Sequence, residues 1–129
     1  MGMLLSLELV PQTNVLIARI SGERPAHDDD ALEDFMEMWG CVSDCCRENE
    51  IHRVLTLVSV AGNTSSLLVL KFFLQLESLG FERCIRTAIV FPTLRQRRVS
   101  QIGIDIASHR GWEMAGFDAE VHARQWLGM

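Results

Sequence analysis

The sequence lacks a run of apolar residues long enough to cross a membrane. Its longest strongly apolar stretch extends from Leu67 to Leu70 and, past Lys71, on to Leu74, whereas a membrane-spanning helix needs roughly 20 such residues. Proline- and serine-rich segments and internal repeats are also missing, which excludes a low-complexity tail and a solenoid. With 129 residues, the chain is expected to form one domain over residues 1–129.

The sequence has no excess of basic residues. Twelve lysines and arginines stand against seventeen acidic residues, for a formal net charge of -5. Such a chain repels a polyphosphate, so we expect no nucleic-acid partner. The amino terminus has no basic leader and reaches Glu8 early, which favours an intracellular, cytoplasmic protein. Its four cysteines are then expected to be free thiols.

Signatures of catalysis and of metal binding are missing as well. Ser65 has no histidine partner in its local motif, and the aspartates at 28–30 are explained as a helix cap. Cys41 and Cys45 lie four residues apart, but no second pair of ligands follows at a spacing typical of zinc sites. We therefore expect neither an enzyme nor a bound metal or cofactor.

Hydrophobic periodicity predicts an alternation of strands and helices. A hairpin of two strands comes first, and helices and single strands then alternate to the end of the chain. Strands are predicted at 3–10, 15–21, 53–60, 86–91 and 112–117, and helices at 27–49, 66–79, 94–110 and 118–127. Because crossover connections are right-handed, the strands after the first should be parallel. The expected fold is α/β, with a mixed, mostly parallel five-stranded sheet and about four helices.

Polar residues gather in the loops that follow the second, third and fourth strands. These loops should meet at the carboxyl edge of the sheet, where α/β proteins usually hold ligands. The loop before the helix at 66–79 consists of helix-capping residue types, which favours a structural role. A phosphoacceptor or ligand-binding hydroxyl at Ser65 is the alternative. The residues of this loop are Asn63, Thr64, Ser65 and Ser66.

Positive charge stands in the first turns of the helix at 94–110. Arg95, Arg97 and Arg98 lie there, and positive charge near a helix N-terminus opposes the helix dipole. An anion held between these guanidinium groups and the loop at Ser65 would explain the placement. A solvated surface is the plainer interpretation.

The element order and the stretch VLTLVSVAGNTSSLLVL, residues 54–70, resemble the STAS domains. Within them, the chain is similar to the SpoIIAA-like proteins, which also look like CRAL-TRIO lipid-binding domains, and the closing FDAEVHARQWL resembles the end of that branch. In the antagonist branch of STAS domains, a kinase phosphorylates a serine in Asp-Ser-Ser/Thr-Gly. Ser65 takes the place of that serine, with Thr64 in place of the aspartate and Leu67 in place of the glycine.

The resemblance implies a non-enzymatic domain that acts through protein contact, as a homodimer or with a regulatory partner. The alternative implied by the CRAL-TRIO similarity is a small carrier or sensor for a lipid or another apolar or anionic molecule. No cofactor is implied by either.

The helix at 66–79 is expected to carry more apolar surface than one domain can cover. Lys71, Gln75 and Ser78 define a polar stripe, and at about 100° per residue three leucines flank it. We expect these leucines to be partly exposed, as a surface for a second copy or an apolar ligand. Burial by neighbouring loops is the alternative. The three are Leu67, Leu68 and Leu74.

The same helical geometry orders the thiols of the helix at 27–49. Cys46 falls on its apolar face and Cys41 on its charged side. We expect Cys41 to be the most reactive thiol of the chain and Cys46 the least.

Overall fold

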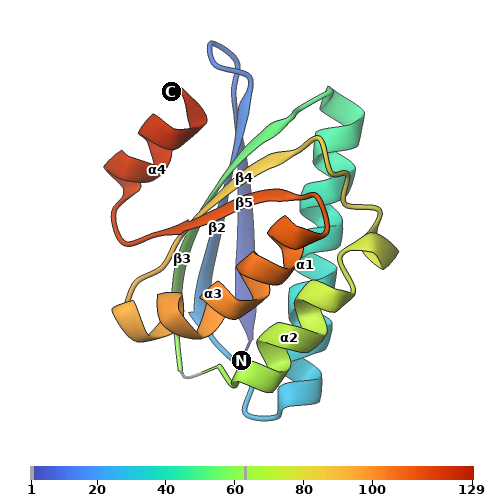
Figure 1. Cartoon of the computed structure of the whole chain (residues 1–129), viewed down its shortest axis with the longest axis vertical. Coiled ribbons are helices and arrows are strands. Elements are labelled where there is room, and N and C mark those ends of the chain that lie inside the picture. The colour runs from blue at the N-terminus through green and yellow to red at the C-terminus, as the bar shows by residue number, and fades with distance from the viewer. Residues whose placement is uncertain (1, 63) are drawn as a thin grey trace.

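The computed structural model describes residues 2–62 and 64–129. Within them, five strands form one sheet in the order β1-β2-β3-β4-β5 (Figure 1). The first pair is antiparallel and the other three pairs are parallel. The strands are β1 Met3–Val10, β2 Val15–Glu23, β3 Arg53–Ala61, β4 Arg86–Val90 and β5 Glu113–Phe117. This topology confirms the predicted mixed, mostly parallel sheet.

Three helices cover one face of the sheet and a fourth covers part of the other (Figure 1). Each parallel crossover moves to the next strand in the same direction, so right-handed connections place their three helices on one side. These are α1 Asp28–Asn49, α2 Ser66–Leu74 and α3 Leu94–His109. The last helix, α4 Glu120–Leu127, packs on the opposite face. None of the described helices is both long and apolar enough to span a membrane.

The core has two layers because successive strand residues point to opposite faces. On β2, Leu16 and Ala18 pack beneath α1, α2 and α3. Their neighbours Val15 and Ile17 pack with α4 instead. β3 alternates in the same way and is apolar on both faces, as its nearly continuous apolar sequence predicts.

β1 is less covered than its alternating pattern predicts. Leu5 packs against the core, but Leu7 is 38% and Leu9 is 43% exposed. β1 is an edge strand of the sheet, so part of its apolar face extends beyond the cover of the helices.

α2 is shorter than the predicted helix at 66–79. It ends at Leu74, and a single 3₁₀ turn follows at Glu77–Leu79. The amide of Gln75 bonds the carbonyl of Phe72 at 3.0 Å, so hydrogen bonding changes from the i−4 to the i−3 pattern, which tightens the chain. Gly80 then ends the segment with φ at 71°, in the left-handed conformation that glycine adopts easily.

Candidate functional site

Ser65 links the amino ends of α1 and α2. Its hydroxyl oxygen accepts the amide of Leu68 at 3.1 Å, and the hydroxyl donates to a carboxylate oxygen of Asp28 at 2.9 Å. The other carboxylate oxygen of Asp28 accepts from the guanidinium of Arg24. Ser65 is therefore the N-cap that the sequence favours, and an aspartate from the first turn of α1 lies beside it. Asn63, the first member of the predicted cluster, lies outside the described residues.

The arginines of the predicted anion site lie on the first two turns of α3. Thr93 caps this helix by accepting the amide of Gln96 at 3.1 Å, and Arg95 borders an open groove together with Thr93 and the end of β3. Among the described residues, neither Arg95 nor Arg98 forms an ion pair. By contrast, Arg97 pairs with Asp118 at 2.9 Å.

The side chain of Gln96 ties α3 to the end of β3. Its amide nitrogen donates to the carbonyl of Val60 at 3.0 Å and lies 3.4 Å from that of Gly62. The loops after β3 and β4 therefore meet at the carboxyl edge, as the sequence predicts.

An apolar cavity of about 90 Å³ lies beneath α2 and opens at this edge. Its deep wall is aromatic, with the Trp39 and Phe72 rings 5.9 Å apart and those of Phe72 and Phe73 5.2 Å apart. Polar and small residues surround the mouth. Further walls come from Ile20, Phe35, Val58, Val60, Leu68, Val69, Ile89 and Phe91, and the mouth from Gly62, Thr64, Gln96 and Ser100.

The apolar cavity and the groove at Arg95 adjoin. Val60, Gly62 and Gln96 line both of them. An apolar compartment therefore lies next to a polar groove that is bordered by a positive charge, that of Arg95. Of the described edge residues that the sequence singles out, Arg95 lines the groove and Thr64 lines the cavity, whereas Ser65, Ser66 and Arg98 line neither. The sequence does not predict the cavity, whose walls come from three helices and from β2, β3 and β4.

One of the three leucines predicted as a surface is buried. Leu67 is 58% and Leu74 is 42% exposed, but Leu68 is only 1% exposed. Leu68 precedes Phe72 by four residues and therefore shares its inward face. The prediction for Leu68 was wrong because the buried side of α2 is wider than the sequence pattern indicates.

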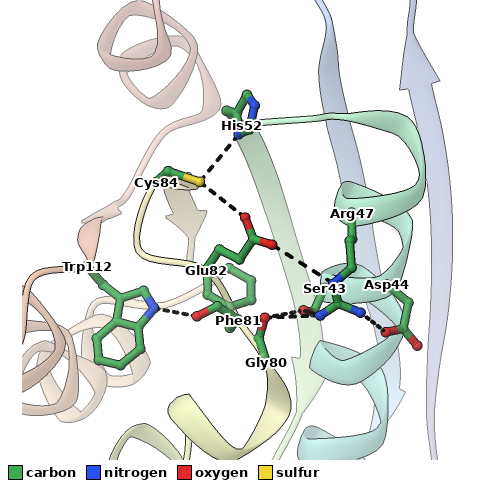
Figure 2. Close-up of polar contacts among 9 residues, drawn as sticks. All are labelled: Ser43, Asp44, Arg47, His52, Gly80, Phe81, Glu82, Cys84 and Trp112. Carbon is green, nitrogen blue, oxygen red and sulfur yellow. Dashed lines mark hydrogen bonds and ion pairs between the residues drawn. The ribbon is translucent and has the colours of Figure 1, made fainter.

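A second polar cluster lies away from the carboxyl edge, between η1 (Glu77–Leu79) and β4 (Figure 2). Cys84 Sγ is 3.5 Å from His52 Nδ1 and 3.4 Å from Glu82 Oε2. The sequence did not indicate this cluster, because His52 and Cys84 are 32 residues apart and follow no local motif. Among the described residues, no group of three potential ligands is placed to hold a metal ion.

No protein-family model and no curated protein matches the chain. Among solved structures, it is similar to an uncharacterized protein of the DUF3478 family from Shewanella loihica PV-4, described as having a SpoIIAA-like fold. The TM-score is 0.52 at 17% sequence identity, over 98% of this chain and 94% of that one. The fold is SpoIIAA-like. This confirms the architecture that the sequence resemblance implies, and the likeness does not point to catalysis.

Proposed function

We propose that this SpoIIAA-like domain is a non-enzymatic carrier or sensor that binds an amphiphilic small molecule. The apolar part of the ligand occupies the cavity beneath α2, and an anionic group lies in the groove at Arg95. The observation that carries this proposal is that the two compartments adjoin and share Val60, Gly62 and Gln96 in their walls.

The dimensions and chemistry of the cavity support an apolar occupant. Its volume of about 90 Å³ is well above the ~10–15 Å³ that one water molecule requires. Aromatic and aliphatic walls offer water few hydrogen-bond partners, and cavities of this kind stay dry and bind apolar molecules. Each methylene that leaves water contributes about 0.8 kcal/mol, so chain length should control affinity.

The groove supports an anionic group at the other end of the ligand. Arg95 forms no ion pair among the described residues, so its guanidinium can receive a carboxylate or a phosphate. Arg95 lies near the start of α3, where its positive charge opposes the helix dipole. A bound anion would neutralise that charge.

Calorimetric titration with butanoate, hexanoate and octanoate tests the proposal. Affinity should rise along the series until the cavity is filled. Val60→Phe should abolish octanoate binding by filling space at the wall that the cavity and the groove share, whereas Val121→Phe, at an exposed position of α4, should not. Arg95→Gln should weaken octanoate but not octanol. Equal binding by Val60→Phe and wild type, with both folded by circular dichroism, would contradict the proposal.

Contact with another protein is a second candidate, favoured by the exposed Leu67 and Leu74 on α2. The two lie seven residues apart, on the same side of the helix. If a homodimer forms there, Leu67→Glu combined with Leu74→Glu should give a folded monomer by light scattering and circular dichroism. A wild-type protein that is already monomeric would exclude this dimer.

A further inference from the structure

Cys84 is an exposed thiol with an imidazole nitrogen on one side and a carboxylate on the other. It lies in the turn before β4, at the edge of the sheet opposite the cavity mouth. Nδ1 of His52 is 3.5 Å from its sulfur, and Oε2 of Glu82 is 3.4 Å from it (Figure 2). A thiol beside an imidazole is the arrangement that activates cysteine for nucleophilic attack.

Hydrogen bonds from side chains to its backbone carbonyl groups hold the segment that carries Cys84 in place. The carbonyl of Gly80 accepts from the Ser43 hydroxyl at 3.1 Å, and that of Phe81 accepts from the Trp112 indole at 2.9 Å. On the other side, the carbonyl of His52 accepts the amide of Arg86 at 2.7 Å. The fold therefore holds the backbone segments that carry Cys84 and His52 next to each other.

We propose that Cys84 is a modification site at which a low-molecular-weight disulfide forms a mixed disulfide with this chain. The thiol proton moves to Nδ1 of His52, and the thiolate attacks one sulfur of the incoming disulfide. The old sulfur–sulfur bond breaks as the new one forms, and the departing thiolate takes the proton from His52. One disulfide is consumed, and one mixed disulfide and one small thiol are produced.

Glu82 slows this reaction and His52 assists it. Burial and the neighbouring Glu82 raise the pKa of the Cys84 thiol, because a carboxylate opposes a second negative charge. The other oxygen of Glu82 lies 3.9 Å from Nε of Arg47, and this ion pair partly neutralises the charge of the carboxylate. Proton transfer to His52 places an imidazolium beside the thiolate and offsets the remainder.

The other thiols differ from Cys84 in burial or in surroundings. Cys46 is buried, and burial raises its pKa to about 12. Cys41 is exposed, as the sequence predicts, and no hydrogen bond joins its thiol to an imidazole among the described residues. It serves as the reference thiol within the same molecule.

Reaction with the uncharged 2-hydroxyethyl disulfide, followed by timed peptide mapping, tests the proposal. Cys84 should carry the adduct, and reductant should remove it. His52→Gln should slow the reaction at Cys84 by about a hundredfold, the lower end of the range for a positioned base, and leave the rate at Cys41 unchanged. Glu82→Gln should speed the reaction at Cys84 by about fivefold. A negative charge about 4 Å away in water raises the free energy of the thiolate by about 1 kcal/mol.

Thermal unfolding by circular dichroism shows whether each variant remains folded. His52 is exposed, and its backbone hydrogen bond to Arg86 does not depend on the side chain. His52→Gln should therefore unfold at the same temperature as the wild-type protein. Two outcomes overturn the proposal: an adduct confined to Cys41, or an equal rate at Cys84 in wild type and folded His52→Gln.

Discussion

Gly103 allows α3 to approach α2 closely, and an added methyl group there should destabilise the protein. A Cβ at Gly103 would lie 2.2 Å from Cδ2 of Phe73 and 2.8 Å from Cγ1 of Val69. Both distances are far below van der Waals contact, so the Phe73 ring must move in Gly103→Ala. Phe73 and Val69 also line the apolar cavity, so the substitution should change the cavity as well.

The magnitude follows from two opposing effects. Overpacking a core costs about 1–3 kcal/mol, and replacing glycine by alanine within a helix returns about 1 kcal/mol. We expect Gly103→Ala to lower the free energy of unfolding by up to about 2 kcal/mol. For a chain of 129 residues, this corresponds to a fall in Tm of up to about 7 °C.

Gly40→Ala is the matched control. Gly40 lies within α1, and nothing lies within 4 Å of a Cβ added there. Gly40→Ala should change helix propensity alone and raise the free energy of unfolding by about 0.5–1 kcal/mol. Urea denaturation of both variants measures the difference. A Gly103→Ala protein at least as stable as Gly40→Ala would refute the close packing of α2 on α3.

Three further effects follow from the contacts of α2 and α1. Ser65→Ala should lower the free energy of unfolding by about 1 kcal/mol through loss of the N-cap, and chemical denaturation should show it; an unchanged midpoint would argue against this cap. Leu68→Ala should lower the free energy of unfolding by about 2–5 kcal/mol and Leu67→Ala by less than about 0.5 kcal/mol, as thermal melts of the two variants would reveal; similar losses in both would contradict the orientation of α2 described above. Cys46 should resist alkylation in the native protein and react only on unfolding, because burial raises its pKa to about 12; rapid native labelling would contradict its burial.

The sequence predicts the five strands of the sheet because each strand carries a clear alternation or a continuous apolar run. β1 begins and ends at the predicted residues, Met3 and Val10. The sequence predicts the end of α2 less well, because the apolar spacing continues through the 3₁₀ turn at Glu77–Leu79. Local periodicity therefore identifies elements more reliably than the point at which hydrogen bonding changes.

The two sites differ in how much the sequence reveals. Gly62, Arg95 and Gln96 come together because they follow neighbouring parallel strands, which is a rule of topology. The pairing of Cys84 with His52 depends on side-chain placement between the ends of two distant segments. The cavity beneath Phe72 is a gap among side chains, and no residue pattern marks a gap.

The proposed amphiphile site is tested most directly by intermolecular nuclear Overhauser effects between octanoate and the protein. The terminal methyl group of octanoate should contact the rings of Trp39 and Phe72, which line the deep wall of the cavity. The protons beside its carboxylate should contact Gln96 and Arg95 at the groove. Contacts of the terminal methyl group with exposed Leu67 and Leu74 alone, and none with Trp39 or Phe72, would contradict the account.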